Sequence, residues 1–478
     1  MTNQVFGKDQ YWFGLALISF FIIGCVTLHH TWLISDVNSY YNQALALLSG
    51  SNNLFFPDPV TGEKVSILDA PYSLGNAAWI ALWQLLLGKK LVFVCSLFCT
   101  FFGIYLTKKS LDLSGFPLIA IFVLFFTLPL QFYTNTLMSG MPSFLWASLY
   151  LYMLVKLEDR WLKWFLLCAL AVFSAWFRES NVLLLGGISM IHFMQIRKYF
   201  FAFMMGSVIG LLPRLVSHQF MFDDPFHFML SEPFSLSAFV SQLDLYLILS
   251  LIFFPLGLLI AILYKGAYQL PFKISVLGFI LFYTAYAYDA TVYSGYIRGS
   301  LVNSRFLLPL APFFTYMLAS QMKKVTLPNW ILPTTSLVAI LFTVICQITI
   351  YREHNKHYVI SQAIQQKYKD EVVIYDRSGL TNITRYINTL TSKFPSQVDI
   401  SKVTDSNYMS RLLNKYDKSI VIVSKNEATD AKMERTQIIS SYMKEASDTY
   451  QLNILDKMPV ENGLSILVYE LKFKQRIN

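Results

Sequence analysis

Residues 29–50 read HHTWLISDVNSYYNQALALLSG and follow the first long apolar run of the chain. Asp36, or the serine before it, can cap a helix here, because either side chain can accept hydrogen bonds from the first free backbone N–H groups. Tyr41, Leu45 and Leu48 recur at helical spacing. The polar residues of the stretch fall on another face: Asn38, Asn42 and Gln43. The pattern predicts an amphipathic helix that leaves a membrane span and lies in the headgroup plane.

This helix would hold the carboxylate of Asp36 where lipid and water meet. A carboxylate in that position can accept a proton from a hydroxyl nucleophile or bind a divalent cation. The alternative is that Asp36 is an acidic cap on a connecting loop.

The composition indicates a membrane protein. Of the 478 residues, 55% are hydrophobic and 14% are charged, and the mean hydropathy is +0.47. Soluble globular chains carry roughly 25% charged residues. The net charge of +9 arises mostly from short basic clusters between apolar runs, a pattern that orients membrane helices and does not indicate nucleic-acid binding. All five cysteines lie in apolar segments, so the sequence predicts neither a disulfide framework nor a thiolate metal site.

The apolar runs predict eleven membrane-spanning helices. The runs lie near residues 11–33, 91–107, 116–133, 142–157, 162–177, 181–196, 199–215, 244–263, 273–290, 305–321 and 330–351. The run 72–88 is expected to lie flat as a juxtamembrane helix, because a crossing there would move every later basic cluster to the wrong side of the membrane. The N-terminus is then cytoplasmic. Three long polar loops are expected outside: 34–90, 216–243 and 289–304.

The composition changes after the last apolar run. Residues 352–478 are rich in Lys, Asp, Ser and Asn. Strands are expected at 371–377, 419–425 and 464–472, and helices at 381–393, 405–416 and 430–446. The predicted fold is therefore an all-α polytopic membrane bundle over residues 1–351 with a small extracytoplasmic α/β domain over residues 352–478.

Charged residues at the outer membrane boundary are the main candidates for function. Arg178 and Glu179 stand between two apolar runs in WFRESNVLLL, and the alternative is a local ion pair that fastens a helical hairpin. Arg305, in NSRFLLPLAPFF, can grip a phosphate bidentately. Its alternative is an arginine that snorkels to the interface. The acidic and histidine residues of loop 216–243 match no metal-site spacing and are expected to be solvated.

Taken together, these segments resemble the C-type (GT-C) glycosyltransferases, a multi-pass superfamily that includes protein O-mannosyltransferases and lipid A aminoarabinose transferases. Four motifs carry the resemblance in chain order. They are Asp36 followed by Tyr40, Ala44, Leu47, Leu48 and Gly50; the segment from Pro71 to Gly88; the Arg-Glu-Ser hairpin at 178–180; and the segment from Arg305 to Pro312. A C-terminal α/β domain completes the order.

The resemblance implies transfer of a sugar from a polyprenyl-phosphate donor to a glycan, lipid or protein acceptor at the extracytoplasmic face of the inner (plasma) membrane. It implies that Asp36 is the catalytic base and that Arg305 and Arg178 stabilise the phosphate leaving group. Glu179, Tyr40 and Arg298 complete the candidate substrate-binding residues. Direct displacement would invert the anomeric carbon, since no second carboxylate is placed to form a glycosyl intermediate.

Two positions depart from the pattern of this superfamily. Val37 stands where many members carry a second acidic residue, and Gly140 stands before Met141-Pro142 where members often carry an acidic residue. No metal ligand is therefore assigned, and a divalent cation at Asp36 remains an open alternative. Two other functions are compatible with the sequence, a transporter or flippase of lipid-linked sugars and a non-catalytic membrane scaffold. Transporters usually show repeated halves and broken mid-membrane helices, and the sequence shows neither.

Overall fold

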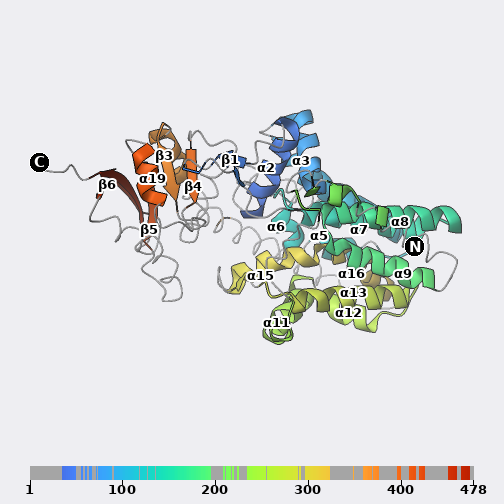
Figure 1. Ribbon diagram of the computed structural model, residues 1–478. Helices are drawn as coiled ribbons and strands as arrows, with labels where there is room; N and C mark the ends of the chain where they lie inside the picture. The colour runs from blue at the N-terminus through green and yellow to red at the C-terminus, as the bar shows by residue number, and fades with distance from the viewer. Residues whose placement is uncertain are drawn as a thin grey trace, which may run out of the picture. The chain divides into compact units, whose positions relative to one another are not determined.

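The fold is seen in a computed structural model (Figure 1). The residues that it describes are 35–49, 55–57, 60–61, 64–66, 72, 74–88, 91–117, 119–125, 127–134, 136–194, 208–209, 212–216, 218–219, 223–225, 234–254, 256–288, 290–291, 296–322, 348, 359–368, 370–375, 396–399, 408–415, 419–425, 450–459 and 465–473. They form two compact units. The larger, helical unit holds the described residues from 72 to 348, and the smaller unit holds those of 35–66 together with those from 359 onward.

The larger unit is built from helices throughout its described residues (Figure 1). Its α-helices are α3 (Leu74–Leu87), α4 (Val94–Leu113), α5 (Ile119–Phe125), α6 (Leu128–Tyr133), α7 (Gly140–Lys156), α8 (Arg160–Phe177), α9 (Gly187–Met194), α11 (Leu236–Ile248), α12 (Gly257–Leu263), α13 (Gln269–Ala285), α15 (Tyr296–Ser304) and α16 (Ala311–Met322). Two π-helical segments, η4 (Val182–Gly186) and η6 (Leu249–Phe253), and one 3-10 segment, η7 (Arg305–Leu310), extend them.

Helix α7 is the centre of this unit, because it packs against α4, α8, α16 and η7. Phe144 and Tyr150 of α7 are fully buried, and Tyr150 shares an aromatic contact with Phe313 of α16. Gly103 brings α4 close to α7, since a Cβ at Gly103 would meet the ring of Phe144 at 2.5 Å. The hydroxyl of Thr107 also donates to the Ser148 Oγ across the same pair of helices, at 3.2 Å. The later residue of α4, Thr107, contacts the later residue of α7, Ser148, so the two helices run in the same direction.

Two described helices are long and apolar enough to cross a membrane, Arg160–Phe177 and Leu236–Phe253. Three shorter apolar helices cover Leu74–Leu87, Val182–His192 and Gln269–Ala285. Helix α8 exposes Trp161, Phe165 and Phe173 on its outer face. Large apolar side chains on the outside of a helical bundle are expected where the surroundings are lipid.

Two predicted spans are wrong in their extent. The run 116–133 forms two helices, α5 and α6, because Thr127 is extended and Pro129 falls in the first turn of α6. The run 244–263 breaks before α12, where Leu256 adopts a left-handed conformation with φ 58°. The helix that precedes this break begins at Leu236, inside the predicted loop 216–243, with Ser235 as its cap. Hydropathy counts apolar residues and does not detect such breaks in the backbone.

Other predicted spans agree with the described helices. The runs 142–157 and 162–177 correspond to α7 and α8, and 273–290 overlaps α13. The runs 11–33 and 330–351 lie outside the described residues, apart from Ile348, as does most of 199–215. The total of eleven spans therefore stays a prediction.

Helix α3 has the length expected of a segment that does not cross. Its 14 residues rise about 21 Å, short of the ~30 Å hydrocarbon core of a bilayer. Gly88, with φ 76°, ends it in a left-handed turn. Trp79 and Trp83 lie on one face, with ring centroids 5.6 Å apart, and both contact Phe98 of α4.

The smaller unit contains a five-stranded mixed sheet. Its strands are β3 (Val372–Tyr375), β4 (Ser396–Asp399), β5 (Ser419–Lys425), β6 (Tyr450–Pro459) and β7 (Ser465–Phe473), in the order β4-β3-β5-β7-β6. The pairs β4-β3 and β3-β5 are parallel, and β5-β7 and β7-β6 are antiparallel. The three predicted strands correspond to β3, β5 and β7. Strands β4 and β6 were not predicted from the sequence.

The helices and the first loop of this unit are described in part. The predicted helix 405–416 is present as α19 (Tyr408–Lys415), whereas 381–393 and 430–446 lie outside the described residues. Strands β1 (Phe55–Pro57) and β2 (Lys64–Ser66) form an antiparallel hairpin in the first loop.

Helix α2 (Ser35–Ser49) begins where the sequence predicted, but its predicted amphipathic face is wrong. Asn42 and Gln43 are buried together with Tyr41, whereas Leu48 is exposed. Burial therefore follows the length of the helix: residues 39–44 are buried all round and residues 47–49 are exposed. A helix that is buried all round has no single apolar stripe.

Replacing Gly75 by alanine is expected to destabilise the larger unit, because a Cβ at Gly75 would collide with the backbone carbonyl of Trp176 in α8. Overpacking of this kind costs about 1–3 kcal/mol of folding free energy. The measurement is the midpoint of thermal unfolding of the detergent-solubilised protein. Gly278→Ala in α13 is the matched control, since a Cβ there meets open space. Equal midpoints for the two variants would contradict the packing of α3 on α8.

Candidate functional site

Two arginines meet at one aromatic ring in the larger unit. The guanidinium carbons of Arg178 and Arg305 each lie 4.8 Å from the centroid of the Phe306 ring. That ring stacks on Tyr283, with centroids 4.7 Å apart and planes 17° from parallel. Arg178 also lies 5.7 Å from the Tyr283 ring, and Arg305 lies 5.4 Å from the Tyr288 ring. These five residues are called the arginine cluster below.

The aromatic rings stabilise two positive charges that would otherwise repel each other. A cation over an aromatic face contributes about 0.5–1 kcal/mol at an exposed site and about 2 kcal/mol or more when desolvated. Arg305 is only 8% exposed, and Phe306 is 6% exposed. Arg178 and Tyr288 are half-buried. The arrangement is therefore a partly desolvated cationic site with aromatic walls, which is suited to an anionic group.

Arg305 is the first residue of the short segment η7, which holds it in position. All six residues of η7 are buried, and Pro309 lies inside it. Proline fixes φ near −65° and lacks an N–H, which a short terminal segment tolerates. This burial favours a site within the protein over an arginine that snorkels to the membrane surface.

Arg178 is placed by the end of α8. Its backbone is extended there, with φ −161° and ψ 121°, and its N–H donates to the Ser174 carbonyl at 3.1 Å. The Nη1 of Arg178 donates to the Arg305 carbonyl oxygen at 3.3 Å. The turn that follows is fixed by the fully buried Asn181, whose Nδ2 donates to the Ser143 Oγ at 2.9 Å and to the Ser174 carbonyl at 3.1 Å.

Glu179 does not pair with the arginine before it. Its Oε1 lies 2.6 Å from Nη1 of Arg214, whose side chain is 9% exposed. The predicted alternative of a local Arg178–Glu179 ion pair is therefore wrong. The Glu179 carboxylate instead links the hairpin to Arg214. Arg178 contacts the rings of Tyr283 and Phe306 in the arginine cluster.

Gly140, one of the two departures from the superfamily pattern, lies directly against Arg305. A Cβ at Gly140 would come within 2.9 Å of Cδ1 of Leu308 and 3.4 Å of the Arg305 carbonyl oxygen. The position where superfamily members often carry an acidic residue is thus beside the arginine cluster. In this chain Leu308 occupies that space.

The remaining predicted residues lie elsewhere. Asp36 stands in the first turn of α2, in the smaller unit, and its side chain lies outside the described residues. Tyr40 is 5% exposed in the same helix. Burial raises the pKa of the adjacent Tyr41 to about 12, which keeps its hydroxyl protonated. Arg298 belongs to α15, and its side chain is likewise outside the description.

A divalent cation at Asp36 stays a prediction. Within the described part of the chain, no three His, Cys, Asp or Glu side chains come together in a group that could hold a metal ion. His218 of the predicted solvated loop is fully buried, whereas Asp223 and Asp224 are exposed.

The aromatic residues of the cluster were missed by the sequence analysis. The available signal was the density of tyrosines in FYTAYAYDA (282–290), which ends α13. Aromatic residues are common in membrane proteins, so this signal was not distinctive. Arg214 was missed as a partner of Glu179 for a similar reason, since nothing in its local sequence indicates a tertiary ion pair.

Replacing Tyr133 by phenylalanine is expected to loosen α15, the helix that leads into Arg305. The Tyr133 hydroxyl lies 3.0 Å from the Leu301 carbonyl oxygen and 3.2 Å from that of Val302, and it donates to them from α6. Losing a buried hydrogen bond costs about 1 kcal/mol. Hydrogen–deuterium exchange of residues 296–304 should therefore become faster. Tyr105→Phe, at a tyrosine that is 47% exposed, is the control, and unchanged exchange in the Tyr133 variant would contradict this role.

Comparison with known proteins supports the fold. Two crystal structures of ArnT from Cupriavidus metallidurans match over 96% of this chain and 98% of theirs. The structure bound to undecaprenyl phosphate gives a TM-score of 0.57 at 11% identity, and the apo structure gives 0.58 at 12%. A scan of protein-family models and a search of curated proteins give no match. The resemblance seen in the sequence is thus confirmed at the level of fold.

Proposed function

We propose that this protein is a membrane glycosyltransferase that moves a sugar from a polyprenyl-phosphate donor to an acceptor at the outer face of the inner membrane. The observation that carries the proposal is the arginine cluster, a cationic site of one buried and one half-buried arginine in a fold shared with ArnT. One ArnT structure is bound to undecaprenyl phosphate, and ArnT is a lipid A aminoarabinose transferase. A fold alone does not define an activity, so the cluster is what links this chain to the chemistry.

The arginine cluster would stabilise the leaving group. When the bond between the anomeric carbon and the phosphate oxygen breaks, negative charge develops on that oxygen. Arg178 and Arg305 lie on one aromatic ring and would be positioned before the reaction begins. Charges fixed in a water-poor site stabilise such a transition state more than mobile charges in water do.

Asp36 would act as the base. The acceptor hydroxyl oxygen attacks the anomeric carbon, its proton passes to the Asp36 carboxylate, and polyprenyl phosphate leaves with the bonding electrons. A single displacement inverts the anomeric carbon. The valine at position 37 and the glycine at position 140 leave Asp36 as the sole carboxylate assigned to this step.

The distribution of basic residues along α7 and α8 indicates the membrane orientation that the proposal requires. Arg178 ends α8 and Gly140 begins α7, so the arginine cluster lies at one end of these helices. The other ends carry Lys156, Arg160 and Lys163. Basic residues favour the cytoplasmic side, and this bias supports an outer position for the arginine cluster. The tail 352–478 would be an extracytoplasmic domain.

Replacing Arg305 by methionine, or Arg178 by methionine, is expected to lower sugar transfer by about 100-fold or more, since one preorganised donor contributes about 10²–10³ in rate. The assay follows release of polyprenyl phosphate from a radiolabelled polyprenyl-phosphate sugar by the purified protein, with a membrane extract added as the source of acceptor hydroxyl groups. Lys108→Gln is the control, because Lys108 pairs with Asp112 on α4 and lies at the opposite end of the helices. Full turnover in both arginine variants would contradict the assignment.

Replacing Asp36 by asparagine is expected to abolish release while leaving donor binding intact, because asparagine cannot take the proton. The two quantities are polyprenyl phosphate released and donor retained by the protein, with Asp112→Asn as the carboxylate control. Undiminished release in the Asp36 variant would rule out the base. Movement of intact donor across vesicles with no release from the wild type would indicate a flippase, and neither activity would indicate a scaffold.

A further inference from the structure

A second cluster lies at the opposite end of the larger unit and has no part in the proposed transfer. Lys163 and Trp164 lie in the first turns of α8, His192 lies in the last turn of α9, and Tyr268 immediately precedes α13. The arginine cluster sits at the far ends of α8 and α13. Helix α8 has 18 residues, so about 25 Å separates its two ends.

The contacts within this cluster fix the lysine. The Lys163 Nζ donates to the Tyr268 hydroxyl at 3.2 Å and lies 5.5 Å from the centroid of its ring. The Tyr268 hydroxyl in turn donates to the Leu154 carbonyl oxygen of α7 at 3.0 Å. The His192 ring lies 4.2 Å from that of Trp164 and 5.4 Å from that of Tyr268. Four segments of chain thus orient one ammonium group.

The backbone at Tyr268 supports this interpretation. Its φ is 59°, in the left-handed region, which strains a residue with a Cβ. Such strain persists only where the surroundings impose it. The contacts to Lys163, Leu154 and His192 are the interactions that hold Tyr268 in place.

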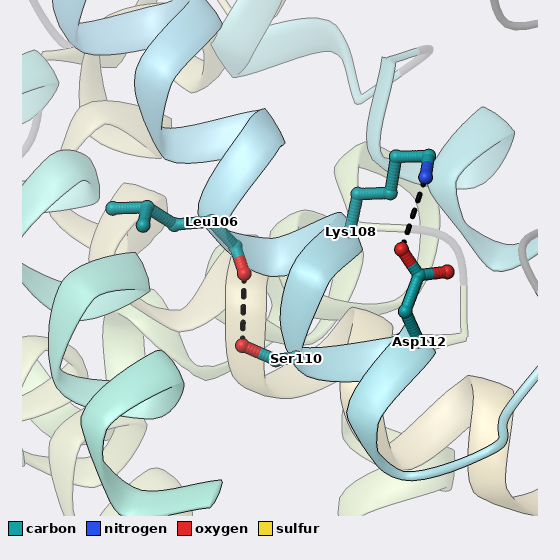
Figure 2. A network of polar contacts seen from close by, with 4 residues as sticks. All are labelled: Leu106, Lys108, Ser110 and Asp112. Atoms are coloured by element: carbon teal, nitrogen blue, oxygen red, sulfur yellow. Dashed lines mark hydrogen bonds and ion pairs between the residues drawn. The ribbon is translucent and has the colours of Figure 1, made fainter. Parts of the chain in front are cut away.

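Lys163 differs from a lysine that is neutralised by its own helix. Figure 2 shows Lys108 paired with Asp112, one turn further along α4. The Lys108 Nζ lies 3.0 Å from Oδ2 of Asp112. In the part of the chain that the structure describes, Lys163 has a tyrosine hydroxyl as its partner and no carboxylate within ion-pair distance. A half-buried ammonium has three N–H donors, and the Tyr268 hydroxyl accepts one of them.

Most charged side chains at this end of the larger unit are cationic. The same ends of α7, α8 and α13, with the turn before α13, carry four more cationic residues: Lys156, Arg160, Lys265 and Lys273. The two acidic residues of the α7–α8 turn are Glu158 and Asp159, and Asp159 is engaged as the cap of α8, where its Oδ1 accepts from the Leu162 N–H at 3.0 Å. The local field therefore attracts an anion.

Apolar side chains flank the same end and select the kind of anion. Trp161 is 68% exposed and Phe165 is 66% exposed on α8, and Leu270 is 52% exposed on α13. A free nucleotide or sugar phosphate gains nothing from such side chains. A phospholipid does, because its phosphate can meet the basic groups while its acyl chains lie along the apolar ones.

We propose that Lys163 and Arg160 bind the phosphate of an anionic phospholipid at the end of the bundle opposite the arginine cluster. The two residues are three apart on α8 and so share one side of the helix. Tyr268 is a positioning residue, which directs the ammonium group. This binding site is separate from the proposed transferase site and does not depend on that activity.

The experiment measures retention of phosphatidylglycerol by delipidated protein in neutral detergent, by native mass spectrometry, with phosphatidylcholine as the uncharged comparison. All measurements use the Arg305→Met background, so that the arginine cluster does not supply the signal. The double variant Arg160→Gln, Lys163→Gln is expected to lose at least 10-fold in phosphatidylglycerol affinity. Glutamine can still donate to the Tyr268 hydroxyl, and an unchanged unfolding midpoint without lipid confirms that the variant is folded.

Lys108→Gln is the matched control and should retain phosphatidylglycerol. Equal retention of phosphatidylglycerol by the double variant, or equal retention of both lipids by the parent protein, would overturn the proposal. Inorganic phosphate at millimolar concentration should not displace the lipid. Complete displacement would overturn the lipid assignment and indicate a site for a free phosphate.

Discussion

The cation–π contact of two guanidinium groups with the ring of Phe306 is the interaction on which the functional argument depends. Burying a charged side chain is costly unless it gains compensating contacts. Here Phe306, Tyr283 and Tyr288 supply cation–π contacts, and the Arg305 carbonyl accepts a hydrogen bond from Arg178. Both guanidinium groups are held against one ring, and in the proposed reaction they would receive the phosphate without first having to be ordered. Preorganisation of this kind is what makes fixed charges effective in catalysis.

The helical scaffold explains why these residues meet. Arg178 ends α8, Tyr283 lies near the end of α13, and Arg305 opens η7. Helix α7 packs on both α8 and η7 and begins beside Arg305 at Gly140. The ends of several elements therefore converge on one place. The opposite ends of α7 and α8 carry lysines and Arg160, so both ends of the bundle are cationic, and they differ in the ligand each is proposed to bind.

Much of this arrangement could be predicted from the sequence. Strand β5 has the predicted bounds, and α7 and α8 correspond to predicted apolar runs, because periodicity and composition are local properties. Arg178 and Arg305 were identified because charged residues at the outer membrane boundary are candidates for function. Their shared aromatic partner could not be found in the same way, since Phe306 meets Tyr283 only through tertiary packing. The breaks at Thr127 and Leu256 were missed because the spans were assigned by hydropathy, which does not register the helix breakers Pro129, Pro255 and Gly257. The polar face of α2 was misassigned because Asn42 and Gln43 are buried by tertiary structure.

The most direct test of the account is a structure of this protein determined with polyprenyl phosphate bound. The account predicts that the phosphate lies within ion-pair distance of both Arg178 and Arg305, beside the Phe306 ring. A phosphate bound away from both guanidinium groups would contradict it.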